Sequence, residues 1–213
     1  AYFFTDWGYK GDWIDNRVTS DFSNIVTIGN PAYYKGASSW AEAELDKALG
    51  YGFITERIRD DMSAKITREE FAEVAVKLYE KYNGAEAKYS DMSVFTDTRN
   101  PEIFKAYELK IVNGVGNNKF APNDPINREQ MAAMLYRLVQ AIAPGTDFST
   151  EGAPTFSDEK DISGWALENV KFMSKNGFIN GIGNNQFGPK LTCSREQAVA
   201  VAVRVYEKYA VSK

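Results

Sequence analysis

Three short phrases of similar sequence each place an arginine between a small polar residue and an acidic one. These motif phrases are Ile66–Glu70, Ile126–Gln130 and Cys193–Gln197. Thr67, Asn127 and Ser194 are residue types favoured at helix N-caps. The Glu or Gln three positions later completes a capping box, in which side chains and backbone amides bond reciprocally. Each motif phrase therefore predicts the start of a helix.

Capping does not explain the arginines. Arg68, Arg128 and Arg195 would lie in the first helical turn, where the helix dipole disfavours a cation by about 0.3–1 kcal/mol. A guanidinium beside free backbone amides is suited to binding a carboxylate or phosphate, which gives one explanation for keeping it. The alternative is an internal partner such as Asp97 or Asp158, forming a salt bridge between repeats. The residues alone leave both explanations open.

The repetition extends upstream of the motif phrases, so the arginines belong to repeated units. The glycine-rich stretches Asn113–Pro122 and Asn180–Pro189 correspond, as do Phe95–Asp97 and Phe156–Asp158, Ser39–Ala41 and Gly164–Ala166, and Gly52–Ile54 and Gly177–Ile179. Each unit is typical of a helix, a loop and a second helix, and the spacing predicts that the second unit lacks about six residues in its first helix. Such a helix pair cannot bury its apolar face alone, so the copies must pack together.

The composition limits what chemistry the chain can do. Of 213 residues, 44% are hydrophobic and 25% charged, which is typical of a globular protein. The chain has no histidine and only Cys193, so the usual nucleophilic triads, most zinc sites and an internal disulfide are excluded, and we expect no metal and no cofactor. A net charge of -4 argues against nucleic acid and anionic membranes as partners. No apolar run is long enough to span a bilayer, and the start at Ala1 shows no signal-peptide pattern.

One combination of motifs resembles a known family. Phe156 with Asp158, Trp165-Ala166, Phe187–Pro189 and Ser194–Gln197 follow one another as in the S-layer homology (SLH) domain. The resemblance implies a mainly α fold of three helix-loop-helix modules in a pseudo-threefold spindle. The modules would span residues 39–84, 94–143 and 155–213. Residues 1–38 are rich in aromatics and fall outside the pattern; we expect a short irregular or β segment, around Phe22–Ile28, that packs on the first module or belongs to an upstream domain.

The resemblance also implies a ligand. SLH domains tether proteins non-covalently to secondary cell-wall polysaccharides, commonly glycans with a pyruvate ketal, and their motif arginine contacts the ketal carboxylate in grooves between modules. Arg68, Arg128 and Arg195 would then be the carboxylate binders. Trp40 and Trp165 match the groove tryptophan that packs on a sugar ring, with core packing as the alternative.

Two further pairs of residues match positions in the family pattern. Gly116 and Gly183 match loop glycines that let a ligand approach backbone amides, although turn geometry explains them equally well. Asp97 and Asp158 match the acid that follows the phenylalanine by two residues. For this acid we expect a structural role, capping a helix or ordering an arginine.

Departures from the family pattern predict that the grooves are unequal. The first unit has residues 55–65 in place of a glycine-rich loop, and the second unit has no tryptophan. We therefore rank the groove that contains Arg195 as the best candidate for ligand binding. We expect the groove lined by the loop of the first unit to bind the ligand poorly. Cys193 precedes a predicted cap without a basic partner and is interpreted as incidental.

Three functions follow, in order of preference. The first is a non-catalytic, carbohydrate-binding anchor in the extracellular cell wall or S-layer of a bacterium. The second is a protein–protein assembly module of a surface protein, with no glycan binding. An enzyme comes last, because the chain has no histidine and no ordered pair of carboxylates.

Overall fold

The computed structural model describes residues 34–210, so the segment Phe22–Ile28 lies outside the described residues. The described chain is mainly helical, as predicted. Its helices are α1 (Glu42–Tyr51), α2 (Arg68–Asn83), α3 (Pro101–Glu108), α4 (Arg128–Ile142), α5 (Leu167–Lys175) and α6 (Arg195–Ala210), with the 3₁₀ turn η1 (Glu159–Asp161). Between residues 34 and 210 the β structure is limited to isolated bridges.

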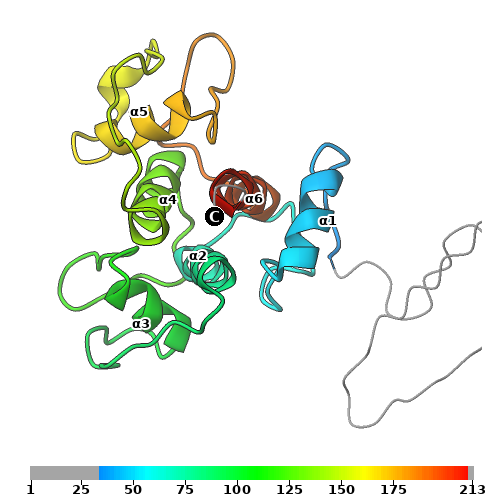
Figure 1. The fold of residues 1–213 in the computed structure, drawn as a ribbon, viewed down its shortest axis with the longest axis vertical. Coiled ribbons are helices and arrows are strands. Elements are labelled where there is room, and N and C mark those ends of the chain that lie inside the picture. Colours follow the sequence, from blue (N-terminus) through cyan, green and yellow to red (C-terminus); the bar gives the residue numbers. More distant parts are fainter. Residues whose placement is uncertain (1–33, 211–213) are drawn as a thin grey trace, which may run out of the picture.

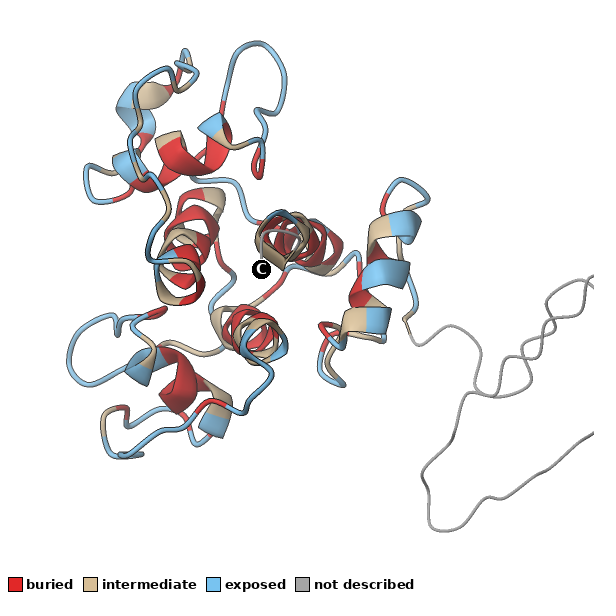
Figure 2. Cartoon of the chain, viewed as in Figure 1, coloured by how far each residue is buried: buried red, intermediate tan, exposed pale blue. Residues whose placement is uncertain are grey.

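The helices form three lobes around a common centre. The long helices α2, α4 and α6 lie at the centre, and α3, α5 and α1 lie outside them (Figure 1). The first lobe contains α2, α3 and the loop 109–127; the second contains α4, α5 and the loop 176–194; the third contains α6, α1 and the loop 52–67. Each long helix therefore packs on the short helix of the next unit along the chain, and α6 packs on α1 of the first unit. The buried residues lie where these helices face one another (Figure 2).

Backbone hydrogen bonds join the three motif phrases in a ring at the centre. The amide of Ile66 donates to the carbonyl of Cys193 (3.0 Å), Cys193 donates to Ile126 (3.2 Å), and Ile126 donates to Ile66 (3.1 Å). All three side chains are buried. Because buried backbone groups must find partners, this ring fixes the starts of the three long helices relative to one another.

The predicted capping boxes are present. The side chains of Thr67 and Asn127 accept from the third amide of their helices, and the bonds back from that residue are also formed. Ser194 Oγ accepts from the amide of Gln197 at 3.3 Å, and the Ser194 amide donates to Gln197 Oε1 at 3.1 Å. Each motif arginine is consequently the first residue of its helix.

The prediction that the second unit has a shortened first helix is wrong. Helix α3 has 8 residues and α5 has 9, so the helices themselves are nearly equal. The missing residues belong to the stretch before the helix, where the third unit has η1 and Trp165. In the second unit Asn100 caps the helix directly, accepting from the amide of Glu102, and Pro101 takes the first position, where its missing amide is harmless.

Candidate functional site

The glycine-rich loops form the same tight turn in the second and third units. Gly116 has φ 102°, and the two asparagines after it have φ 49° and 52°. The amide of Lys119 closes the turn on the Gly116 carbonyl at 2.9 Å. Gly183 repeats this geometry at φ 102°. The positive φ favours glycine at both positions, and a Cβ added there would meet no atom within 4 Å, so the space in front of each glycine is open.

The acids at Asp97 and Asp158 hold these loops in place. Asp97 accepts from the amides of Phe120 (2.8 Å) and Ala121 (2.9 Å), and Asp158 accepts from Phe187 and Gly188 (both 2.8 Å). Burial alone would raise the pKa of each carboxyl, but the two amide hydrogen bonds outweigh it, so both pKa values fall below the usual range. In the structure these two side chains order the loop, and neither makes a helix-cap hydrogen bond or a hydrogen bond to an arginine.

Arg68 and Arg128 bind the loops through backbone carbonyls. Arg68 Nε donates to the carbonyl of Phe120 (2.9 Å) and Nη2 to that of Asn113 (3.2 Å). The Arg128 guanidinium makes the matching bonds, at 2.8 and 2.5 Å, to the third unit. Each guanidinium also stacks over the ring of the loop phenylalanine, at 4.7 and 4.8 Å from its centroid. Within residues 34–210 neither arginine has a carboxylate in an ion pair, and neither Nη1 has a hydrogen bond.

Arg195 has a different partner. Its Nη2 and Nε donate to the Glu70 carboxylate at 2.5 and 3.3 Å, and its Nη1 donates to the Asp61 carbonyl at 3.0 Å. Glu70 stands where the other two motif phrases have glutamine. An internal salt bridge between repeats therefore does occur, but at this arginine and with a partner other than Asp97 or Asp158.

This contact corrects the predicted ranking of the grooves. Because Arg195 bonds Asp61, it faces the loop of the first unit, so the groove expected to bind first and the groove expected to bind poorly are the same one. The backbone register puts Asp60 where the third unit has Phe187, so this loop also offers no ring for the guanidinium.

The glutamate after each motif arginine was missed by the sequence reasoning. It bonds the segment that precedes the first helix of the next unit: Glu129 accepts from the amide and Oγ of Ser163 (both 2.9 Å), Glu196 accepts from those of Ser38 (2.7 and 2.9 Å), and Glu69 accepts from Thr98 Oγ1 (3.3 Å). Glu129 and Glu196 are buried. The signal was in the sequence, as a Ser two residues before Trp40 and before Trp165 and a Glu in every motif phrase.

The two tryptophans are at the surface. Trp40 is 52% exposed and Trp165 is 56% exposed, so the alternative of core packing is wrong. Each follows by two residues a serine, Ser38 or Ser163, that is held by the buried glutamate of a long helix. An exposed indole beside a fixed backbone is free to contact a ligand with its ring face.

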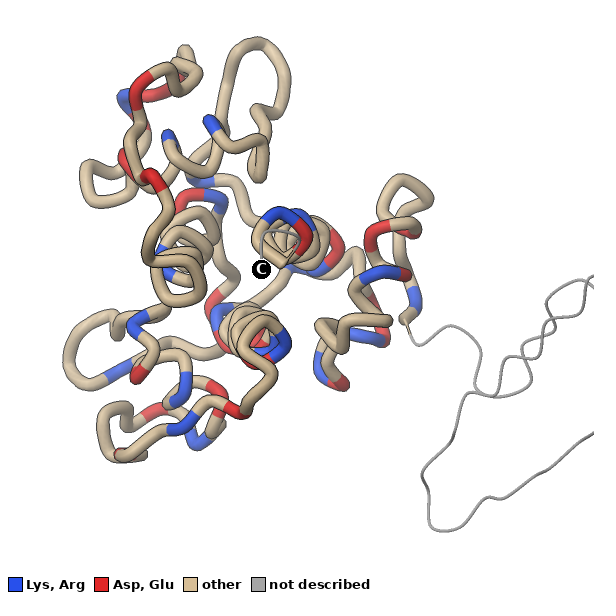
Figure 3. The backbone as a smooth tube through the Cα atoms, viewed as in Figure 1, with Lys and Arg blue, Asp and Glu red and all other residues tan. Residues whose placement is uncertain are grey.

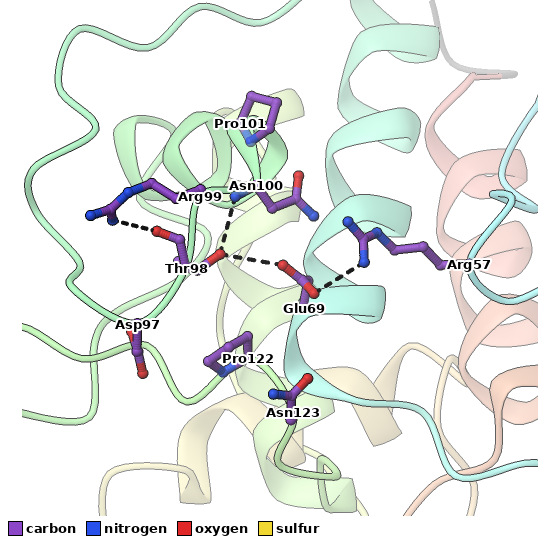
Figure 4. A pocket seen from close by; sticks show the side chains of 9 residues that line it. All are labelled: Arg57, Glu69, Asp97, Thr98, Arg99, Asn100, Pro101, Pro122 and Asn123. Atoms are coloured by element: carbon purple, nitrogen blue, oxygen red, sulfur yellow. Dashed lines mark hydrogen bonds and ion pairs between the residues drawn. The ribbon is translucent and has the colours of Figure 1, made fainter.

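A cavity of about 460 Å³ lies beside the start of α2 (Figure 4). It is lined by Arg57, Glu69, Asp97, Thr98, Arg99, Asn100, Pro101, Pro122 and Asn123. Arg57 comes from the loop of the first unit and pairs with Glu73 at 2.7 Å and Glu69 at 3.4 Å. Arg99 Nη1 donates to the carbonyls of Phe95 and Thr98. The charged side chains that line this cavity are therefore already bonded to other groups of the protein.

Charge is unevenly distributed over the lobes. Acidic and basic residues are mixed along the helices (Figure 3), whereas residues 176–189, around the loop that Arg128 contacts, carry no charge. Among residues 34–210 there is no group of three or more His, Cys, Asp or Glu that could hold a metal ion. Over the same residues no helix is long and apolar enough to cross a membrane. Cys193 is buried, and burial raises the pKa of its thiol to about 11, so it is not a nucleophile at neutral pH.

Comparison with known proteins shows which domains this chain is similar to. Residues 89–132 and 155–199 match the S-layer homology domain family. An exoglucanase, XynX, from Acetivibrio thermocellus is 32% identical over 89% of this chain, and an amylopullulanase from Thermoanaerobacterium thermosulfurigenes is 34% identical over 95%. A cellulosome-anchoring protein of Acetivibrio thermocellus is 28% identical over 67% of the chain. The chain spans 18%, 11% and 32% of these relatives, respectively.

Proposed function

We propose that this chain anchors a protein at the bacterial cell surface by binding a secondary cell-wall polysaccharide through its motif arginines. An extracellular, cell-wall-associated location agrees with the matched domain family and with the relative named as a cellulosome-anchoring protein. The observation that carries the ligand proposal is the state of Arg68 and Arg128. Both are half-buried guanidinium groups that lack a carboxylate partner in the described chain, and each bonds a loop that also contains an open glycine turn. A pyruvate ketal would supply the missing carboxylate.

Residues 39–84 form, in this proposal, a third and divergent module. The matched segments cover the second and third units only. The first unit nevertheless has the same order of helix, loop and capped helix, and its Ser38 takes the same glutamate contact as Ser163. Its divergence is concentrated in the loop that faces Arg195.

The three arginines are proposed to have unequal roles. Arg68 and Arg128 would bind the ligand carboxylate through groups left free by the loop carbonyls. Arg195 is already neutralised by Glu70, so a ligand would have to displace a charged hydrogen bond to reach it. We assign Arg195 to structure and the other two arginines to binding.

Catalysis is not proposed for this chain. The exoglucanase and the amylopullulanase are matched over 18% and 11% of their length, so the activities in their names do not transfer to it. Assembly with another protein remains a second candidate, because Ile182 and Leu191 are 47% and 51% exposed and both lie within 3 Å of a Cβ built on Gly188. These two adjacent exposed aliphatic side chains form a small apolar surface, which the assembly candidate takes as its contact with a partner.

A sedimentation assay with isolated cell wall tests the proposal. Wild-type protein is expected to co-sediment with wall and to lose binding when the pyruvate is removed. Arg68→Ala and Arg128→Ala should each weaken binding at least about tenfold, a loss of about 1.4 kcal/mol. Arg195→Ala should change the affinity less than twofold. Unchanged binding in both of the first two variants, with their folds intact by circular dichroism, would exclude glycan binding through the arginines. Binding that depends instead on Ile182 and Leu191 would favour assembly with a protein.

A further inference from the structure

The chain contains four Asn-Gly pairs, which the structure divides into two classes. They begin at Asn83, Asn113, Asn176 and Asn180. An asparagine followed by glycine is prone to deamidation, because without a Cβ on the glycine its backbone nitrogen can approach the side-chain amide carbon of the asparagine. The reaction therefore needs two accessible groups, the backbone amide of the glycine and the side chain of the asparagine. By sequence the four pairs are equivalent.

Two of the pairs lie at the ends of helices, where both groups are hydrogen-bonded. After α2 the amide of Gly84 donates to the carbonyl of Glu80 at 2.8 Å. Asn83 Nδ2 donates to the carbonyl of Tyr79 at 3.0 Å. The pair 176–177 makes the corresponding bonds to the last turns of α5, at 3.0 Å from the glycine amide and 2.9 Å from the asparagine side chain. These bonds must open before the nitrogen can reach the side-chain carbon.

The other two pairs lie in the glycine-rich loops, and neither of their reacting groups is hydrogen-bonded. Asn113 and Gly114 are exposed, as are Asn180 and Gly181. Within residues 34–210 neither glycine amide donates a hydrogen bond, and neither asparagine side chain makes one. Exposure alone does not set these pairs apart, because Asn83 is also exposed. The hydrogen bonds make the difference.

We propose that Asn113 and Asn180 are sites of spontaneous deamidation in the folded protein. The glycine amide nitrogen loses its proton and attacks the side-chain carbonyl carbon of the asparagine. The new C–N bond closes a succinimide ring, and Nδ2 takes up the proton and leaves as ammonia. Water then adds to one of the two ring carbonyl carbons and breaks its bond to nitrogen, which gives aspartate or isoaspartate. The reaction consumes only water, and the loss of ammonia makes it irreversible.

Each site includes a contact with a motif arginine. The carbonyl of Asn113 accepts from Arg68 Nη2 at 3.2 Å, and the carbonyl of Asn180 accepts from Arg128 Nη2 at 2.5 Å. Aspartate at either position adds a negative charge to a residue already bonded to the guanidinium, which disfavours a second carboxylate from a ligand. Isoaspartate runs the backbone through the side chain and so displaces the carbonyl that the arginine bonds. Both products should weaken wall binding; this consequence rests on the proposed function, whereas the deamidation does not.

Peptide mapping by mass spectrometry tests the assignment of the two sites. The full chain is incubated at mildly alkaline pH, in native buffer and in concentrated urea, and the conversion of amide to acid is followed at each Asn-Gly pair. In native buffer Asn113 and Asn180 should convert at least about tenfold faster than Asn83 and Asn176. In urea the four rates should converge, because the protecting hydrogen bonds are lost. Equal rates at all four pairs in the folded protein would overturn the proposal.

Wall sedimentation of the incubated samples tests the consequence. Wild-type protein should lose wall binding in step with conversion. The double variant Asn113→Gln with Asn180→Gln should keep the binding that it has at the start, because glutamine would have to close a larger ring. Asn83→Gln with Asn176→Gln is the matched control and should lose binding as wild type does.

The outcomes separate this inference from the proposed function. If the loop asparagines convert but wall binding does not fall, the proposed effect on the arginines is wrong, even if Arg68→Ala abolishes binding. If Arg68→Ala and Arg128→Ala both retain wall binding, the proposed function fails, whereas the measured deamidation rates keep their meaning.

Discussion

The motif arginines have different partners although their local sequences are nearly the same. What separates them is the residue two positions after each arginine, which is Glu70 in the first motif phrase and glutamine in the other two. Glu70 closes its own capping box and also bonds Arg195 of the third motif phrase. The capping boxes and the positive-φ turns were predictable, because both depend on residues close in sequence. The Glu70–Arg195 pair was not, because its members are 125 residues apart.

The carboxylate of Asp158 should stabilise the protein in a pH-dependent way. Its pKa is lowered in the folded state, so its contribution is present above the unfolded pKa of about 3.9 and is lost as the pH falls through the folded value. Asp158→Asn should lower the free energy of unfolding by about 2 kcal/mol at pH 7, because two charged hydrogen bonds are lost.

Urea unfolding at several pH values checks this expectation. The gap between Asp158→Asn and wild type should narrow below about pH 4. Asp161→Asn, an exposed carboxyl in the same segment, is the matched control and should cost less than about 0.5 kcal/mol. A gap that stays constant from pH 7 to pH 3 would mean that the carboxylate form does not hold the loop.

At the scale of elements, sequence periodicity could not predict which helices pack on one another. The offsets between repeats identify equivalent residues but not which copy an apolar face packs against, because all copies present the same pattern. The structure pairs α2 with α3, α4 with α5 and α6 with α1. For the same reason the missing residues of the second unit were placed inside a helix, whereas they lie before α3.

The contact between α2 and α3 depends on a buried lysine. Lys105 donates to Glu80, Glu86 and Glu102, each at 2.9 Å, and its pKa is raised by these carboxylates despite its burial. Lys105→Met should lower the free energy of unfolding by about 2–3 kcal/mol, because it leaves partly buried carboxylates without their main counter-ion.

Thermal unfolding compared with a control lysine checks the effect. Lys171→Met removes a more exposed pair with Glu159 (2.9 Å) and should cost less than about 1 kcal/mol. Equal losses in the two variants would mean that the α2–α3 contact does not depend on the buried charge network.

At the scale of the whole molecule, the units of sequence are not the units of packing. Each lobe combines helices from two units, and the ring of Ile66, Ile126 and Cys193 joins all three. The three-module arrangement was expected from the family resemblance. The sharing of each lobe between two units was not expected, because it depends on contacts between the first and last units of the chain.

Because each lobe contains helices from two units, we expect a single cooperative unfolding transition for residues 34–210. In differential scanning calorimetry the calorimetric and van't Hoff enthalpies should agree. Leu45→Ala, which empties a buried site in α1, should move the whole transition to lower temperature, corresponding to about 2–5 kcal/mol. Several transitions, of which only one moves in this variant, would show that the lobes unfold independently.

The pairing of α1 with α6 has a mechanical consequence. Both ends of the described chain lead into the third lobe, where Arg204 and Glu44, and Lys47 and Glu207, connect these two helices. Tension applied through either end reaches that lobe first. The loops that contact Arg68 and Arg128 belong to the other two lobes and are loaded only through the shared centre. Stretching the described chain through its two ends should therefore separate α1 from α6 before it disturbs the loops that contact Arg68 and Arg128.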